Sequence, residues 1–185
     1  MKCSLLLLLI PCLSMAVAEK SEVEKRINKE FNVQSESSLA IDNKYGRIDI
    51  AIGDANKIKM EVVMKVKAGS DKKAQETLDR ISVDLSQSGN RVLASTNISS
   101  SSGWMSWFDT GNVEMEISYN VLVPADIYMD LRQKYGSIFV ETANRDLRID
   151  LSYGDVRLGD INAKLSMQMA YSDGVISRIK DGNQM

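Results

Sequence analysis

The strongest constraint on the fold is a short repeat in the C-terminal part of the chain. Tyr135, Tyr153 and Tyr171 follow one another at intervals of 18 residues, and the first two are each followed directly by glycine. The same interval relates three further columns: Leu131, Ile149 and Met167; Ala143, Ile161 and Ile179; and Asn144 and Asn162. A fixed short period that involves several columns predicts repeated units that stack on one another.

Each repeat unit has the pattern of β-structure. In the second unit, Leu147, Ile149 and Leu151 alternate with polar residues, so one strand face is apolar. Gly154 interrupts the alternation, and a second short strand is predicted for 156–161. We therefore expect an all-β fold, a β-solenoid similar to a right-handed β-helix, with repeats of about 18 residues and one short helix.

An antiparallel arrangement explains the same period. If each Tyr-Gly pair were a tight hairpin turn, the units would form a meander that closes as a sandwich or barrel. Short fixed periods favour the solenoid, but the pattern leaves both arrangements open. The last unit departs from the repeat, because Gly174 stands two places late and Val175 adds an apolar residue, which predicts a bulge or a terminal rung.

The residues before the repeat are less regular. In the lead-in of residues 19–37, Val23, Ile27 and Phe31 lie four residues apart, which fits either a short amphipathic helix or an irregular segment. The alternating domain begins at residue 38, where two strands are predicted around the Tyr45-Gly46 turn.

One helix and one hairpin are expected in the middle of the chain. Ser70 and Asp71 are good caps for a helix over 72–80. Ser88-Gly89-Asn90 separates two stretches rich in β-branched and apolar residues, which is typical of a hairpin because Gly and Asn tolerate a positive φ.

The first 18 residues have the composition of a secretory signal peptide. Lys2 is followed by a leucine-rich stretch, and small residues at Ala16 and Ala18 predict cleavage before Glu19. We therefore expect three parts: a signal peptide over 1–18, a lead-in over 19–37, and a β-rich repeat domain over 38–185. No second apolar run is long enough to predict a transmembrane segment after cleavage.

The residue types that are missing exclude several chemistries. Both cysteines, Cys3 and Cys12, lie in the signal peptide, and Pro11 before Cys12 argues against lipid attachment. The chain contains no histidine, which removes imidazole bases, the common triads and most zinc sites. After residues 1–18 are removed, 22 basic and 25 acidic residues remain, a balance that argues against a nucleic-acid partner.

Acidic residues provide no recognisable reactive site. Asp155 and Asp173, with Asp160 nearby, could in principle offer oxygen ligands to calcium, but solvated turn aspartates explain them equally well and no calcium-repeat motif is present. No paired carboxylates with catalytic spacing are visible. The sequence therefore predicts no metal, no cofactor and no enzymatic activity.

Two groups of aromatic residues are candidates for a role. Trp104, Trp107 and Phe108 follow a serine-rich stretch and could bind a glycan or protein, or else cap the end of the repeat domain. The Tyr135, Tyr153 and Tyr171 column is better explained as a structural ladder of stacked rings than as a ligand site.

Several stretches resemble a known family. Residues 27–33, 39–48 and 119–124, together with the Tyr-Gly units, resemble the bacterial putative-adhesin domain family of exported envelope proteins, of the Bacteroidetes type. The resemblance covers most of residues 27–180. It implies a β-helix-like domain in the periplasm or on the surface of a Gram-negative bacterium, and it supplies no catalytic residues.

These observations lead to one expectation and two alternatives. We expect a non-catalytic, adhesin-like module that contacts a surface, a glycan or an envelope protein. A periplasmic structural or sensing component that binds a small ligand or envelope partner is the second hypothesis, and a carbohydrate-active enzyme is the third. Because the chain stops at Met185 soon after a tyrosine unit, we expect either a truncated sequence or an end covered by a partner or a second copy.

Overall fold

A computed structural model of the protein describes residues 20–34, 36–99 and 113–180. In this part of the chain, nine strands form one open mixed sheet, accompanied by one helix. The elements are β1 (Ser21–Asn32), β2 (Ser38–Ile52), β3 (Lys57–Ala68), α1 (Asp71–Leu78), β4 (Ile81–Ser88), β5 (Arg91–Ile98), β6 (Val113–Val123), β7 (Tyr128–Ala143), β8 (Leu147–Ile161) and β9 (Leu165–Ile179). The predicted all-β class is confirmed. The predicted signal peptide lies outside the described residues.

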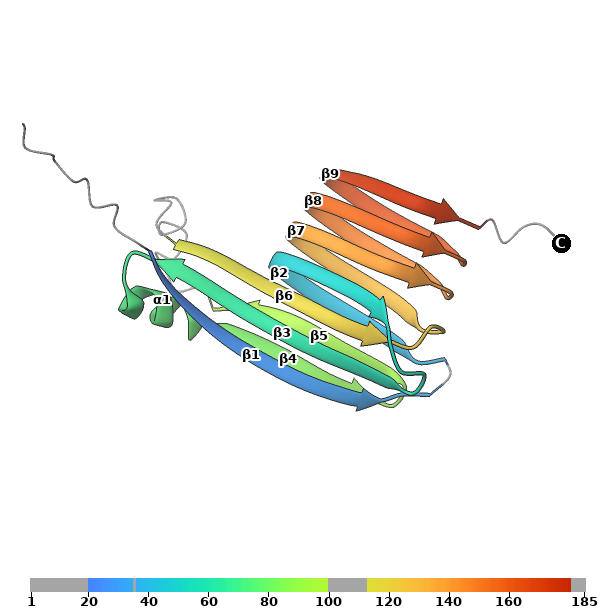
Figure 1. Cartoon of the computed structure of the whole chain (residues 1–185), viewed down its shortest axis with the longest axis horizontal. Coiled ribbons are helices and arrows are strands. Elements are labelled where there is room, and N and C mark those ends of the chain that lie inside the picture. The colour runs from blue at the N-terminus through green and yellow to red at the C-terminus, as the bar shows by residue number, and fades with distance from the viewer. Residues whose placement is uncertain (1–19, 35, 100–112, 181–185) are drawn as a thin grey trace, which may run out of the picture.

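The sheet contains four long strands that bend in the middle. They are stacked in the order β2, β7, β8, β9, and each doubles back on itself (Figure 1). We call these four strands the rung stack. Neighbouring rungs pair in parallel, and in β7, β8 and β9 the paired residues are 18 positions apart, as in Met129 with Leu147 and Leu147 with Leu165. Each Tyr-Gly pair therefore lies inside a strand, where the alternative prediction placed a hairpin turn.

The bends have a local cause in the backbone. Tyr45, Tyr135, Tyr153 and Tyr171 all have positive φ angles, between 53° and 60°, so the chain turns at each tyrosine. The following residue must tolerate close backbone packing: a Cβ on Gly136 would lie 1.7 Å from the Gly46 carbonyl oxygen. Only glycine fits there, which explains why the sequence repeats Tyr-Gly as a unit.

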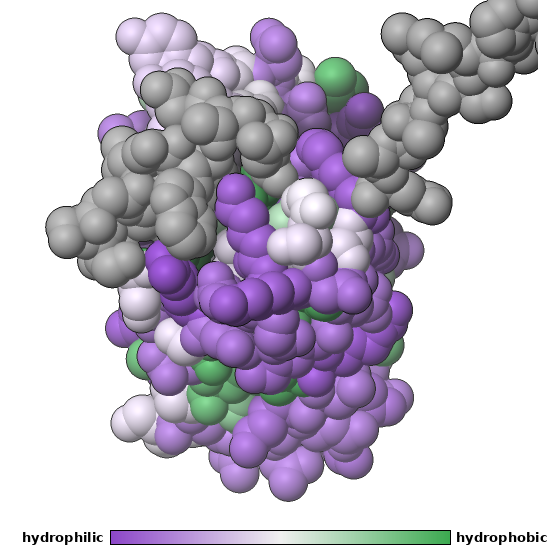
Figure 2. Space-filling view, turned by 90° about the vertical axis from the view of Figure 1, so that its left-hand side faces the viewer, coloured by the Kyte–Doolittle hydropathy of each residue, from purple (hydrophilic) through white to green (hydrophobic). Residues whose placement is uncertain are grey.

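The bends fold the sheet into two facing layers. At Tyr45, β2 changes partners: residues 38–42 pair with β5, and residues 46–52 pair with β6. One layer therefore contains β4, β5 and the first halves of the four rungs. The other layer contains β1, β3, β6 and the second halves of the rungs. We call the second layer the outer layer. Figure 2 shows that the end face near the bends is mainly hydrophilic, with small hydrophobic areas.

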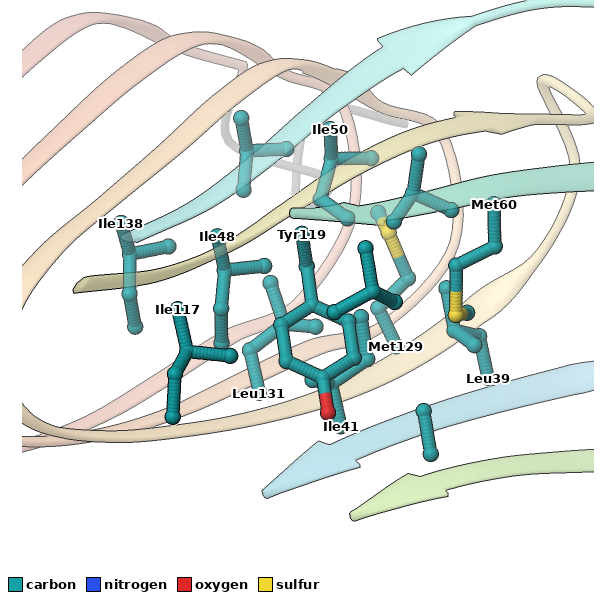
Figure 3. Close-up of a cluster of buried hydrophobic side chains, with 14 of the residues drawn as sticks. Leu39, Ile41, Ile48, Ile50, Met60, Ile117, Tyr119, Met129, Leu131 and Ile138 are labelled. Atoms are coloured by element: carbon teal, nitrogen blue, oxygen red, sulfur yellow. The ribbon is translucent and has the colours of Figure 1, made fainter. Parts of the chain in front are cut away.

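The core lies between the layers. Alternate residues of every strand point inward, and Tyr119 from β6 is packed among Ile41, Ile48 and Leu131 of the rungs (Figure 3). A buried polar chain also joins the layers: the Tyr119 hydroxyl bonds to Thr96 at 2.8 Å. Core packing, this hydrogen bond and the backbone pairing of β2 with β5 and β6 thus connect the antiparallel strands to the rung stack.

The same polar chain continues beneath the first bend. The Thr96 hydroxyl donates to Asn43 Oδ1 at 2.8 Å, so the Tyr119 hydroxyl must donate to Thr96. Asn43 Nδ2 donates to the Ile117 carbonyl at 2.9 Å and to Gln133 Oε1 at 3.0 Å. This network satisfies buried polar groups at the point where β2 leaves β5 and joins β6.

The structure tests the predictions made for the lead-in, the helix and the hairpin. Residues 21–32, for which a short helix was one of two predictions, form strand β1, which pairs with β3 along its whole length and turns Val23, Ile27 and Phe31 toward the core. The predicted helix exists, with Ser70 as its N-cap, but ends at Leu78. The predicted hairpin around Gly89 is confirmed by the antiparallel pairing of β4 with β5.

Candidate ligand-binding groove

A row of outward-facing side chains crosses the outer layer from strand to strand. Register places Asn28 of β1 beside Glu61 of β3, Glu61 beside Asn120 of β6, Asn120 beside Asp49 of β2, and Asp49 beside Phe139 of β7. These residues are far apart in the sequence, and only the pairing of the strands brings them together. Neighbouring strands lie about 4.8 Å apart, so the row presents a functional group at each step of that length.

A hollow of about 660 Å³ lies over this row. Its floor is apolar at Ala51, Leu122 and Phe139, and its polar groups include Lys59 and Glu30. A second hollow of about 270 Å³ adjoins it and shares Asp49 and Phe139 with the first, while adding Arg157 from β8. We call the two hollows together the groove.

Phe139 is the main apolar contact in the groove. Its side chain is 43% exposed, while its neighbours Ile138 and Val140 are buried in the core. An aromatic ring held outward by a strand whose neighbouring residues are fixed in the core offers a large contact area at low entropic cost. Leu122 is exposed to a similar degree and widens this apolar surface.

Glu61 and Glu30 in the groove form hydrogen bonds or ion pairs with neighbouring side chains. Glu61 accepts hydrogen bonds from Asn120 Nδ2 and from Arg26 Nη1, both at 3.0 Å. These bonds lower the pKa of Glu61 below its ordinary value, the bond from Asn120 contributing most. Asn120 is thereby fixed in orientation. Glu30 forms an ion pair with Lys57 at 3.1 Å.

Asp49 behaves differently from the other groove acids. Partial burial raises its pKa, and the guanidinium of Arg47, whose Nε lies 3.0 Å from Asp49 Oδ2, opposes that shift. Glu116 adds a smaller effect that also raises the pKa of Asp49. The partly desolvated carboxylate beside Phe139 is a strong hydrogen-bond acceptor.

The residues predicted from sequence lie elsewhere. Trp104, Trp107 and Phe108 lie outside the described residues. Tyr135, Tyr153 and Tyr171 form one column with Tyr45 at the bends, with ring centroids 5.2, 5.1 and 5.0 Å apart in succession. None of these four tyrosines lines the groove.

The aspartates considered for calcium show no cluster. Asp155 and Asp173 are paired across β8 and β9, and Asp160 forms an ion pair with Arg178 at 3.7 Å. Within the residues that the structure describes, no group of three or more His, Cys, Asp or Glu side chains could hold a metal ion. No helix of the same residues has the length and hydrophobicity needed to span a bilayer.

The groove was missed in the sequence for a physical reason. Its residues belong to six strands, β1, β2, β3, β6, β7 and β8, and no local spacing relates them. One signal was visible: Phe139 stands at the polar position of an alternating strand, between Ile138 and Val140. A large aromatic residue at an outward position is a candidate for a contact surface.

Comparisons with known proteins give distant likenesses only. No protein-family model matches the chain, and no curated protein matches it. Among solved structures, the chain is similar to a putative cell adhesion protein from Clostridium sporogenes, with 8% identity, 84% of this chain and 100% of that chain covered, and a TM-score of 0.38. A putative adhesin from Parabacteroides distasonis has 8% identity, covers 81% of this chain and 67% of its own, and has a TM-score of 0.28. A putative adhesin from Bacteroides fragilis has 10% identity, with 84% and 95% covered and a TM-score of 0.28. Identities and TM-scores this low carry no inference about function.

Proposed function

We propose that the chain is an exported, non-catalytic binding module of a bacterial cell envelope, and that its groove recognises a neutral oligosaccharide. The observation that carries the proposal is the exposed ring of Phe139 beside the Asp49 carboxylate and the Asn120 amide. A sugar ring offers an apolar C–H face to the aromatic ring and hydroxyl groups to the carboxylate and amide. The three side chains match both kinds of group.

The direction of the groove supports an elongated ligand. It crosses the strands from β1 to β8, over a sheet whose backbone groups are already paired between neighbouring strands. A peptide that adds a strand needs an unpaired edge, which the middle of the outer layer does not offer. A chain of sugar units, held by side chains alone, fits this surface better.

The mixture of charges favours a neutral glycan. Glu30, Asp49 and Glu61 lie in the groove together with Lys59, Arg47 and Arg157, so neither sign dominates. An acidic or basic polymer would meet repulsion along much of its length.

The absence of catalysis is part of the proposal. Glycoside hydrolysis needs a protonated acid and a second carboxylate across the scissile bond. The hydrogen bonds from Asn120 and Arg26 lower the pKa of Glu61, so its carboxyl group stays ionised and is a poor general acid. This supports binding without turnover.

We also propose that the rung stack is a short β-solenoid that continues from the antiparallel strands, and that the signal peptide exports it to the periplasm or cell surface. The parallel pairing at intervals of 18 residues supports the first point. Protease treatment of intact cells tests the second, because a surface module is digested and a periplasmic one is protected.

A glycan array followed by calorimetry tests the binding function. The exported chain, residues 19–185, is expected to bind neutral oligosaccharides, and Phe139→Ala is expected to weaken the best ligand by about tenfold or more. Asp49→Asn should also weaken binding. Val175→Ala is the control, because Val175 is exposed on the same face but lies two strands away from Phe139.

Two outcomes would contradict the proposal. The first is that the folded chain binds no neutral glycan, or binds one with equal affinity after Phe139→Ala. The second is the release of new reducing ends from a bound oligosaccharide, lost on Asp49→Asn, which would make the chain an enzyme.

A further inference from the structure

In the part of the chain that the structure describes, the last rung, β9, exposes an apolar surface. Among the described residues, β9 pairs with β8 and has no second neighbour. Its inward residues Leu165, Met167, Met169 and Ile176 are only partly buried, although their counterparts in β8 are fully buried. Tyr171 and Val175 are 82% and 66% exposed. We call this surface the β9 face.

The β9 face lacks the charges that protect another edge of the same sheet. β1, at the opposite end of the strand order, has six charged residues among its twelve: Glu22, Glu24, Lys25, Arg26, Lys29 and Glu30. β9 has only Asp173 and Arg178 among fifteen, and Arg178 is engaged by Asp160. Charged side chains on an edge strand prevent pairing with another chain. The remaining edge, β4, is short, at eight residues.

The two ends of the rung stack differ in whether they can pair with a strand of a second copy. Both halves of β2 are already paired, with β5 and with β6, so no second copy can add its β9 below β2. A head-to-tail stack of copies is therefore blocked. A contact between two copies related by a twofold axis uses only the β9 face of each copy. It gives a closed dimer and leaves no β9 face free for a further copy.

From these observations we propose that the β9 face is the interface of a symmetric dimer of this chain. The twofold axis runs along the rung, between the two layers. It places the first half of β9 antiparallel to the second half of the partner's β9. In the register that we propose, Met167 lies opposite Ile176 of the partner subunit and Met169 lies opposite the partner's Gly174. The core-facing side chains of the two β9 strands then lie on the same side of the paired strands.

The side chains at this contact are complementary. Gly174 has no side chain that would obstruct Met169 of the partner subunit. One face of the Tyr171 ring stacks on Tyr153 at 5.0 Å. In the dimer the other face meets Tyr171 of the partner subunit, and the tyrosine column continues through the interface.

The symmetry has a consequence for ligand binding. The axis exchanges the two layers, so the outer layers of the two copies, and with them the two grooves, open on opposite sides of the dimer. A dimer of this kind would link two glycan-bearing surfaces. Dimer formation itself does not depend on what the groove binds.

Sedimentation and light scattering test the dimer. The exported chain is expected to be dimeric at about 100 µM. Tyr171→Lys should make it monomeric and lower its unfolding temperature only slightly, because the exposed ring loses a single intramolecular contact, the stacking on Tyr153. Leu122→Lys is the control: it places the same charge on a similarly apolar, exposed position in the groove and should leave the dimer intact while changing glycan binding.

A second variant provides independent support. Tyr171→Cys places one thiol of each copy next to the twofold axis, so oxidation should give a covalent dimer in high yield, and the same substitution at Val175 should give less. A wild-type chain that is monomeric at about 100 µM, or a dimer that survives Tyr171→Lys, overturns the proposal. A wild-type chain that is dimeric but binds no neutral glycan contradicts the proposed function only.

Discussion

Tyr45 stacks on Tyr135 with their ring centroids 5.2 Å apart and their planes inclined by 12°. The tyrosine column therefore begins in β2, far before the segment in which the repeat is visible in the sequence. β2 is the first rung, and it joins the antiparallel strands to the stack because its two halves pair with different strands. The following predictions test how this junction and the bends above it stabilise the fold.

Adding one methyl group at a bend should destabilise the protein strongly. A Cβ on Gly154 would lie 1.6 Å from the Gly136 carbonyl oxygen, which is backbone and cannot move aside. We expect Gly154→Ala to lower the free energy of unfolding by about 3 kcal/mol, measured by urea denaturation.

Gly69→Ala is the matched control for this change. A Cβ at Gly69 meets nothing within 4 Å, so the expected effect is below about 0.5 kcal/mol. Equal losses in the two variants would show that close packing at the bend is not the cause.

Removing the Asn43 side chain should be costly, because it leaves several buried groups without partners. Gln133, Thr96 and the Ile117 carbonyl all bond to it. We expect Asn43→Ala to cost about 2–3 kcal/mol in chemical denaturation. Asn97→Ala, which removes an exposed bond to Asp84, should cost less than about 1 kcal/mol. A smaller loss for Asn43 than for Asn97 would contradict the role of the network.

Stability should fall in alkaline solution through Tyr119. Burial raises the pKa of Tyr119 from 10.0 to about 12, partly opposed by the hydrogen bond with Thr96, while Asp42 and Asp84 add smaller raising effects. The folded state thus retains the phenol proton after the unfolded chain has lost it. This contribution is complete below pH 10 and is lost as the pH rises through about 12, in total roughly 3 kcal/mol.

The ionisation of Tyr119 can be followed by the absorbance of tyrosinate. One tyrosine should titrate with a pKa near 12 in the folded protein, and Tyr119→Phe should remove that step. A wild-type titration without a late step would disprove the assignment.

The tyrosine column should contribute to stability through ring contacts. Tyr153 stacks on Tyr135 and Tyr171, with centroids 5.1 and 5.0 Å apart. Tyr153→Ala should cost about 1–2 kcal/mol and reduce the near-ultraviolet circular dichroism of the tyrosines, whereas Tyr153→Phe keeps the stacked rings and should cost little. If both variants unfold at the wild-type temperature, the stacking adds nothing measurable.

Much of the rung stack could be predicted from local pattern. The interval between Tyr135 and Tyr153 matched the register of β7 with β8, because parallel rungs repeat the same environment at the same chain spacing. The pattern did not reveal that Tyr45 belongs to the column. A long insertion, containing β3 to β6, separates β2 from β7, so no fixed period relates them.

The groove was beyond prediction for a related reason. Asp49, Asn120 and Glu61 became neighbours through a parallel pairing of β2 with β6 and an antiparallel pairing of β6 with β3. Alternation tells which side chains share a face of one strand, but it carries no information about which strand lies beside it.

The sequence by itself determined the all-β class, the capped helix, the β4–β5 hairpin and the spacing of the C-terminal rungs, because each depends on backbone preferences and periodicity over a few residues. Only the tertiary structure decided that residues 21–32 form an edge strand, that β2 serves two layers, and which side chains form the groove. Those features depend on long-range strand pairing, in which the burial of a whole face outweighs the preferences of any short segment.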